Sequence, residues 1–296
     1  MELNKFKGLG IAMVTPFNAE GNIDTAALKK LTNFLIEGGA DYLVVQGTTG
    51  ESPVLSKAEK QQTLDLVADV NKGKLPIVFG IGGNNTAALV NDLQTYDLSK
   101  VDAILSASPY YNKPTQEGIY QHYKTLAEAT SLSIILYNVP GRTASNVLPS
   151  TTLRLANDFE NIIAVKEASG DMEQIMTIIR DKPDDFLVIS GDDALTMPFI
   201  AAGGNGVISV VGNAFPIEFK NMVAASLNDD MPAARALHYN LLPIIPMLFA
   251  EGNPAGVKEV LKLKGICDAH VRLPLVNISD NLKAALQIET DRINNL

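Results

Sequence analysis

The sequence predicts an α/β protein of the (β/α)8 TIM-barrel class with a C-terminal helical appendage. Short apolar segments, typical of strands buried on both faces in a parallel sheet, recur eight times along the chain. Segments with the period of an amphipathic helix separate them, and this alternation indicates parallel strands. The repeat of about 25–30 residues favours a closed barrel, because the alternative, a doubly wound sheet, usually has fewer strands.

The strands are expected at Gly10–Pro16, Tyr42–Gln46, Ile77–Gly80, Ala103–Ala107, Ser133–Tyr137, Ile162–Lys166, Leu187–Ser190 and Gly206–Val210. Amphipathic helices are expected between them, for example at Thr25–Glu37 and Lys57–Asn71. Asp24 and Ser56 are suitable N-caps for these two helices. Ser56 is followed three residues later by Glu59, which is the pattern of a capping box.

Past Val210 the chain is predicted to be helical. The expected helices are Pro216–Ser226, Met231–Leu248, Pro254–Lys262 and a final segment near Asp280–Asn294. A barrel needs only one helix after its last strand, so the surplus is expected to form an appendage. We therefore divide the chain into a catalytic barrel domain, residues 1–225, and a C-terminal helical appendage, residues 226–296.

The composition is ordinary for a soluble globular protein, since 46% of the 296 residues are apolar and 19% are charged. The net charge of −9 and the lack of a dense Lys/Arg run argue against a nucleic-acid-binding surface. No stretch approaches the roughly 18 uninterrupted apolar residues of a membrane span. The N-terminus lacks the order of a signal peptide, and the single Cys267 cannot form an intramolecular disulfide, so a cytoplasmic location is expected.

A lysine inside an apolar strand points to the chemistry. Lys166 follows four apolar residues in the predicted strand Ile162–Lys166. Burial of an amine lowers its pKa, and a neutral amine is a nucleophile that forms Schiff bases with carbonyl substrates. The alternative is a lysine at a strand end that reaches water or pairs with Glu167.

Polar side chains gather at the predicted carboxyl ends of other strands, where the active sites of barrels lie. Thr48–Thr49 follows the second strand, Tyr110–Tyr111 the fourth, and Tyr137 and Arg142 lie at the end of the fifth. Hydroxyls, a lysine and an arginine on one rim suit carbonyl chemistry on a carboxylated substrate. Each group also has a plainer interpretation: a tight turn for the threonines, a strand aromatic for Tyr137 and a solvated loop for Arg142.

Other kinds of site find less support. Asp192–Asp193 resembles a metal pair only weakly and is expected to cap a helix instead. The Ala202–Gly206 segment resembles a phosphate-binding turn, although a close turn without a ligand fits equally well. The three histidines lie far apart and Cys267 has no evident base nearby, so neither a metal site nor a catalytic thiol is expected.

Four motifs occur in order on the predicted rim: Gly47–Glu51 (GTTGE), Ser108–Pro114 (SPYYNKP), Tyr137–Thr143 (YNVPGRT) and Val165–Asp171 (VKEASGD). With them the chain resembles the dihydrodipicolinate synthase branch of the pyruvate-dependent class I aldolase family, which also contains N-acetylneuraminate lyase. The resemblance runs from about Gly8 to the last helices. Each motif is modest by itself, but the four in this order are highly specific.

The resemblance implies a condensation that uses no cofactor beyond a covalent imine. Lys166 would condense with pyruvate, and the resulting enamine would attack the aldehyde of aspartate semialdehyde. Transimination and cyclisation would then release 4-hydroxy-tetrahydrodipicolinate, an intermediate toward diaminopimelate and lysine. The chain would thus be a lyase with pyruvate and aspartate semialdehyde as its substrates.

The resemblance also implies a role for each residue of the rim. Tyr137, Thr49 and, from a neighbouring subunit, Tyr111 would form a proton relay of hydroxyl groups. Thr48 and Thr49 would contact the carboxylate of pyruvate, and Arg142 would bind the carboxylate of the semialdehyde.

Two further residues and the oligomeric state follow from the same resemblance. Gly191 and Ile208 would line the pocket, the latter through its backbone. If Tyr111 serves a neighbour's site, the active unit is at least a homodimer. The family is often a homotetramer made of two tight dimers.

The motif Gly141-Arg142-Thr143 favours the synthase branch, because the lyase branch lacks this arginine. N-acetylneuraminate lyase and other 2-keto-3-deoxy sugar-acid aldolases remain as alternatives. From other classes, a non-catalytic keto-acid sensor would not need the complete relay. A phosphate-binding barrel enzyme would leave the buried Lys166 without a purpose.

Inhibition by lysine is expected to be weak or absent. Asn84 and Tyr110 match the effector site of sensitive family members. A glutamate of that site is replaced here by Ala88, and its histidines are replaced by Lys57 and Lys60. The ammonium group of an effector needs a carboxylate, and two added cations repel it.

Overall fold

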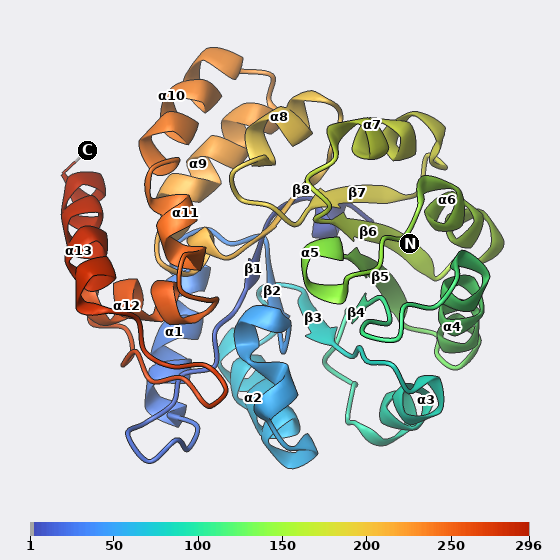
Figure 1. The fold of residues 1–296 in the computed structure, drawn as a ribbon, viewed down its shortest axis with the longest axis horizontal. Helices are drawn as coiled ribbons and strands as arrows, with labels where there is room; N and C mark the ends of the chain where they lie inside the picture. Colours follow the sequence, from blue (N-terminus) through green and yellow to red (C-terminus); the bar gives the residue numbers. More distant parts are fainter. Residues whose placement is uncertain (1–2, 296) are drawn as a thin grey trace.

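Eight parallel strands close into a barrel in chain order, so that β1 pairs with both β2 and β8. The structure is a computed structural model that describes residues 3–295. Figure 1 looks along the barrel and shows the helices in a ring around the strands. The predicted (β/α)8 class is confirmed, since each strand is connected to the next through helical segments on the outside.

The strands are β1 Gly8–Ala12, β2 Tyr42–Val45, β3 Ile77–Gly80, β4 Ala103–Ala107, β5 Ser133–Asn138, β6 Ile162–Glu167, β7 Leu187–Ser190 and β8 Gly206–Ser209. The bounds of β3, β4 and β7 coincide with the prediction. Those of β2, β5, β6 and β8 differ from it by one residue at one end. These strands were found accurately because both of their faces are buried, so that each is a nearly continuous run of apolar residues.

The prediction for β1 was wrong at both ends. The strand begins at Gly8 because this residue pairs with Gly206 of β8, where a Cβ on Gly206 would lie 2.1 Å from the Gly8 carbonyl oxygen. It ends at Ala12, and after one more bond to β2, from the Met13 amide to the Val44 carbonyl at 3.0 Å, the chain leaves the ladder. The Val14 amide donates to the side chain of Asn213 at 3.2 Å, and Pro16 has no N–H to donate.

The helices around the barrel are α1 Thr25–Glu37, α2 Lys57–Asn71, α3 Thr86–Thr95, α4 Gln116–Glu128, α5 Pro140–Thr143, α6 Pro149–Asp158, α7 Met172–Asp181, α8 Thr196–Ala201 and α9 Pro216–Leu227. Both predicted caps are confirmed. The Asp24 carboxylate accepts from the Ala27 amide, and Ser56 forms a reciprocal capping box with Glu59.

After α9 come α10 Met231–Leu241, α11 Ile244–Phe249, α12 Ala255–Leu263 and α13 Asp280–Asn294. The single helix predicted at Met231–Leu248 was wrong. The chain turns at Leu242–Pro243 and starts again as α11, because Pro243 cannot donate the bond that would continue α10. Helix α9 ends at Leu227, and the division at residues 225 and 226 stays a prediction.

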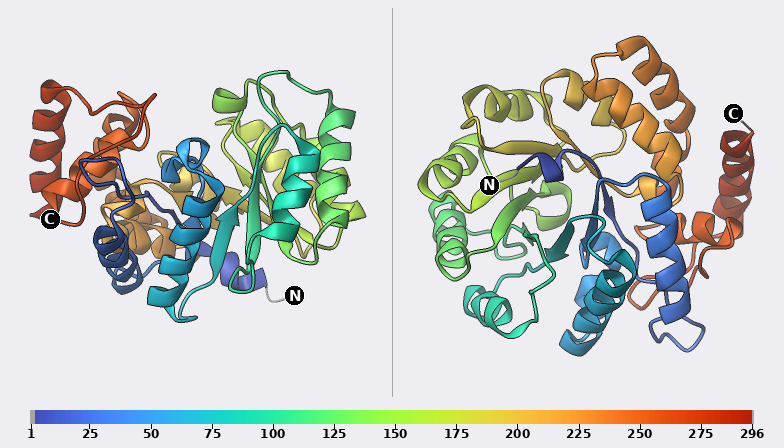
Figure 2. Two further views of the ribbon diagram at one scale, coloured as in Figure 1. Left: turned by 90° about the horizontal axis from the view of Figure 1, so that it is seen from below. Right: turned by 180° about the vertical axis from the view of Figure 1, so that it is seen from behind.

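Helices α12 and α13 lie beside the barrel rather than in its ring (Figures 1 and 2). They are next to α1, whose Lys30 donates to the Gly265 carbonyl at 2.6 Å. No helix among residues 3–295 is long and apolar enough to cross a membrane.

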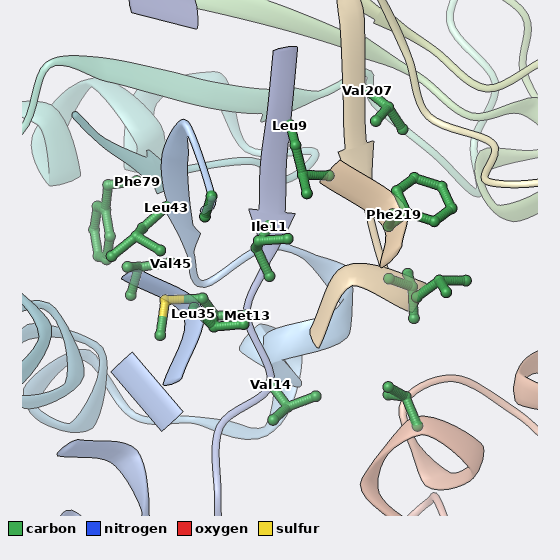
Figure 3. Close-up of a cluster of buried hydrophobic side chains, with 14 of the residues drawn as sticks. Leu9, Ile11, Met13, Val14, Leu35, Leu43, Val45, Phe79, Val207 and Phe219 are labelled. Carbon is green, nitrogen blue, oxygen red and sulfur yellow. The ribbon is translucent and has the colours of Figure 1, made fainter. Parts of the chain in front are cut away.

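Alternate side chains of the strands fill two separate cores. Inside the barrel, Tyr42 and Val44 pack with residues of the other strands. Outside it, Leu43 and Val45 face the helices (Figure 3), together with Leu9 and Ile11 of β1. Because successive residues point to opposite faces, a single strand serves both cores, and this alternation decides which side chains reach the barrel mouth.

His122 of α4 gives the stability a dependence on pH. It is buried, its Nδ1 lies 2.8 Å from Thr86 Oγ1, and its Nε2 has no partner within residues 3–295. Burial lowers the pKa of His122 to about 4. An unfolded imidazole titrates near 6.5, so the unfolded chain takes up a proton first, and the fold loses roughly 3 kcal/mol as pH falls through this window.

We expect His122→Gln to remove this loss, because the amide retains polar contact with Thr86 but does not titrate. The measurement is the free energy of unfolding of both proteins from pH 7 to pH 4. The comparison with wild type is needed because burial raises the pKa of Asp193 to about 6, which acts in the opposite direction. Parallel curves for the two proteins would contradict the assignment to His122.

Candidate active site

Lys166 lies near the carboxyl end of β6 and points into the barrel. It is paired in register with Tyr137 of β5, and its Nζ lies 4.3 Å from the centroid of the Tyr137 ring. Only 5% of the lysine is exposed, and it makes no ion pair with any of residues 3–295. The Lys166 amine is therefore held out of bulk water without a carboxylate bound to it.

The alternative partner, Glu167, faces the other way. Its carboxylate accepts from the side chains of Asn138 and Gln174 and from the Ser169 amide, at 2.8–3.1 Å. Burial raises the pKa of Glu167, and these hydrogen bonds oppose the rise. A pairing between Lys166 and Glu167 is therefore excluded by the alternation of side chains along β6.

The threonine pair forms the 3-10 turn Thr48–Gly50 directly after β2. Thr49 is buried, and the turn is held to the segment that follows β1 through the Thr15 hydroxyl, which donates to the Gly50 carbonyl at 2.7 Å. Glu51 ends the turn in the left-handed region at φ 55°. Thr48–Gly50 is a tight turn, as the plainer interpretation had it, and it also presents both threonines to the barrel mouth.

A cavity of about 330 Å³ at the barrel mouth brings most of the predicted residues together. Its lining includes Lys166, Tyr137, Thr48, Thr49, Arg142 and Gly191. Gly191 is needed here because a Cβ on it would lie 2.7 Å from Cβ of Ala168 and 3.0 Å from Cε of Lys166. Ile208 is buried in the barrel core and its side chain does not line this cavity.

A second cavity of about 490 Å³ adjoins the first and shares Thr48, Tyr137 and Arg142 with it. Tyr110 and Lys60 lie on its wall. Asp192 also lines the first cavity, but the Arg142 side chain forms no ion pair within the described residues. An unpaired guanidinium at a cavity wall suits the carboxylate of a substrate.

Tyr111 lies apart from the cavity of its own chain. It is 88% exposed and has a φ of 64°, which a bulky residue rarely adopts. The predicted effector residues are brought together: the Asn84 side chain accepts from the Tyr110 amide at 2.7 Å and donates to its carbonyl at 2.6 Å.

Two residues of the C-terminal region, one in the loop before α12 and one in α12 itself, were missed by sequence reasoning. The Asn253 amide donates to Thr49 Oγ1 at 3.0 Å, and it lines the cavity beside Lys166. Lys258 of α12 forms a fully buried ion pair with Glu51, with 2.6 Å between Nζ and Oε1. The sequence did offer a signal for Lys258, because it lies among apolar residues of a predicted helix.

Further bonds complete the clamp around Glu51. Lys258 also donates to the His270 carbonyl at 2.7 Å, and the Arg272 amide donates to the second carboxylate oxygen of Glu51 at 3.0 Å. Both charges are thus hydrogen-bonded away from water, which is the condition for burying an ion pair. The clamp joins the end of the threonine turn to α12.

The other candidate sites have structural roles in the fold. Asp192 accepts from the Ala194 and Leu195 amides and caps the turn into α8, while Asp193 accepts from the amides of Val210 and Val211. Within residues 3–295 no group of three His, Cys, Asp or Glu side chains could hold a metal ion.

The histidines and the cysteine do not converge. His122, His238 and His270 lie on separate segments, α4, α10 and the loop after α12. Cys267 is buried, and burial raises the pKa of its thiol to about 12, which disfavours the thiolate that nucleophilic catalysis needs.

A barrel with a buried, unpaired lysine beside tyrosine and threonine hydroxyls defines a class I aldolase type of site. The model of the dihydrodipicolinate synthetase family matches residues 5–291, and the chain belongs to this family. It is 54% identical over 291 residues to a 4-hydroxy-tetrahydrodipicolinate synthase of Flavobacterium psychrophilum, a match that covers 98% of this chain and 99% of the relative.

Solved structures agree with this membership. The dihydrodipicolinate synthase of Thermotoga maritima superposes with a TM-score of 0.96 at 38% identity, covering 99% of this chain and 100% of that one. A chloride-inhibited dihydrodipicolinate synthase of Acinetobacter baumannii complexed with pyruvate gives a TM-score of 0.95 at 36% identity, covering 98% and 99%.

We expect Lys258→Met to cost about 3–5 kcal/mol of stability, because it leaves the Glu51 carboxylate buried and unpaired. The double variant Glu51→Gln/Lys258→Met should recover at least half of this loss. Urea unfolding at fixed protein concentration measures both. Lys283→Met, which breaks an exposed pair with Asp280, is the matched control and should leave stability nearly unchanged. A loss at Lys258 as small as this control would contradict the role of the clamp.

Proposed function

We propose that the protein is a 4-hydroxy-tetrahydrodipicolinate synthase, which condenses pyruvate with aspartate semialdehyde on the way to diaminopimelate and lysine. The observation that carries the proposal is the unpaired amine of Lys166, buried beside Tyr137 in a cavity that also holds two threonines and an arginine. The names of the relatives, at about 50% identity over nearly the whole chain, support the same activity.

The first half of the reaction activates pyruvate. The neutral amine of Lys166 adds to the ketone carbon, and loss of water leaves an imine. A proton then leaves the methyl carbon, and its electron pair makes the enamine. The covalent imine withdraws the electrons itself, so the proposed chemistry needs no organic cofactor and no metal.

The second half joins the two substrates. The enamine carbon attacks the aldehyde carbon of aspartate semialdehyde, and the aldehyde oxygen becomes a hydroxyl. The amino group of the same substrate then attacks the imine carbon, closes the ring and releases the Lys166 amine. The product is 4-hydroxy-tetrahydrodipicolinate.

The remaining residues bind and transfer protons. Thr48 and Thr49 hold the pyruvate carboxylate, Arg142 holds that of the semialdehyde, and Tyr137 with Thr49 moves protons to and from the reacting atoms. Gly191 leaves room beside the imine, a role that its short distance to Lys166 supports. Ile208 contributes its backbone to the pocket wall.

The relay is completed by Tyr111 of a second copy of the chain. Its 88% exposure and its place outside the cavity of its own chain support this assignment. We therefore propose a homo-oligomer of at least two chains, either a homodimer or a homotetramer. The buried Cys267 and the biosynthetic role of the relatives support a cytoplasmic location.

Borohydride trapping tests the imine. With pyruvate and borohydride, we expect one reduced pyruvyl adduct per chain, located on Lys166 by peptide mass analysis. Lys166→Ala should give no adduct. An adduct on another lysine, or none in the wild-type protein, would refute the proposal. A non-catalytic keto-acid sensor would bind pyruvate without consuming aspartate semialdehyde.

Product assays then distinguish the aldolases. Consumption of aspartate semialdehyde with pyruvate selects the synthase. Cleavage of N-acetylneuraminate, or of another 2-keto-3-deoxy sugar acid, at a higher kcat/KM would select the lyase alternatives instead.

We expect Tyr137→Phe to lower kcat by a factor of about 10²–10⁴, the usual contribution of a general acid–base group. The ring stays and continues to pack beside Lys166, so the fold should be unchanged by circular dichroism. Tyr120→Phe is the matched control, since its hydroxyl donates to the Asp158 carboxylate at 2.7 Å, outside the proposed relay. Near-normal turnover of Tyr137→Phe would remove Tyr137 from the mechanism.

We expect lysine to inhibit weakly or not at all. Ala88 offers no carboxylate for the effector ammonium, and Lys57 already engages Asp92 at 2.7 Å. A titration of activity with lysine at fixed substrate concentration checks this expectation, and half-inhibition at micromolar lysine would contradict it.

A further inference from the structure

Asn253 connects the C-terminal helices to the reaction site through one hydrogen bond of defined direction. It lies between α11 and α12 and is 7% exposed. Its Nδ2 donates to Thr49 Oγ1 at 3.0 Å, and its Oδ1 is buried with no partner within residues 3–295. The same side chain lines the cavity that contains Lys166.

The direction of this bond limits what Thr49 can do. A threonine hydroxyl has one proton to donate and two lone pairs that accept, whereas an amide NH2 group only donates. Asn253 therefore occupies a lone pair of Thr49, and the hydroxyl proton is left for another acceptor. No group among residues 3–295 accepts it, and the cavity shared with Tyr137 and Lys166 is the space that Thr49 faces.

A chain of hydroxyls transfers a proton only when every hydroxyl in it points the same way. We infer that Asn253 is a positioning residue that sets the direction of the Thr49 hydroxyl, so that its proton points into the cavity toward the reacting atoms. The inference rests on the proposed function, in which Thr49 belongs to the proton relay.

The buried clamp holds Asn253 at this distance. Lys258 lies one turn into α12, and its amide donates to the carbonyl of Pro254, the residue after Asn253. Its ammonium binds Glu51, which follows Thr49 by two residues, and lies 4.3 Å from the centroid of the Phe17 ring. The two ends of the Asn253–Thr49 bond are thus tied together a second time by an ion pair.

Two substitutions of similar size distinguish the direction of the hydrogen bond to Thr49 from the packing of the side chain at position 253. In Asn253→Asp the ionised carboxylate only accepts, so it takes the proton of Thr49 and reverses the bond. In Asn253→Leu the donor and the acceptor are both lost, so no hydrogen bond from residue 253 orients the Thr49 hydroxyl. The measured quantity is the rate of imine formation at saturating pyruvate. The reaction is quenched with borohydride at set times, and the reduced adduct is quantified by mass spectrometry of the intact protein.

Asn253→Leu should lower this rate by about tenfold without changing its pH profile, and Asn253→Asp should lower it by about a further tenfold at pH 8. The Asn253→Asp rate should recover as pH falls and the carboxyl gains a proton to donate. Repulsion between that carboxylate and pyruvate raises the concentration needed for saturation, so the rates are compared at saturating pyruvate.

The pH recovery occurs within one variant, so a folding defect does not imitate it. An Asn253→Asp rate that equals that of Asn253→Leu or of wild type across the pH range, with normal adduct formation by wild type, overturns this inference alone. Absence of an adduct in wild type overturns the proposed function and this inference together.

Discussion

The site depends on which way two consecutive side chains of β6 point. Lys166 enters the barrel, where it lies against Tyr137 and forms no ion pair, while Glu167 leaves it and is held by amide donors on the outer side. A shift of one residue in β6 would exchange them and place the Glu167 carboxylate where the amine now lies. The buried contacts on both faces of the strand prevent that shift, so the packing of the barrel itself keeps an amine without a counterion at its mouth.

The C-terminal helices complete this arrangement from outside the barrel. The Glu51–Lys258 pair is removed from water, which is costly, and its charges are stabilised by the His270 carbonyl and the Arg272 amide. Loss of either partner would leave the other charge buried and unpaired, so the two side chains must meet for either to be tolerated. It holds the threonine turn against α12, so the catalytic rim and the appendage form one structural unit.

Much of the fold and of the site followed from short patterns. Seven strands were placed to within one residue at either end, because burial on both faces makes each an uninterrupted apolar run. The errors have local causes: the apolar run of β1 continues into Met13 and Val14 beyond the sheet, and Pro243 divides a segment that is otherwise helical in pattern. Reading the carboxyl ends of the strands also found Lys166 together with four of the residues that line its cavity, Thr48, Thr49, Tyr137 and Arg142.

What the sequence by itself determined is therefore the barrel, the buried lysine and the polar rim, because each depends on the period of one strand or on residues directly after it. Only the tertiary structure decided that Lys166 and Tyr137 face each other and that Tyr111 lies outside its own site. It also decided that Asn253 and Lys258 reach Thr49 and Glu51. These contacts join residues about 200 positions apart, and no local period records which distant helix will close over the mouth of the barrel.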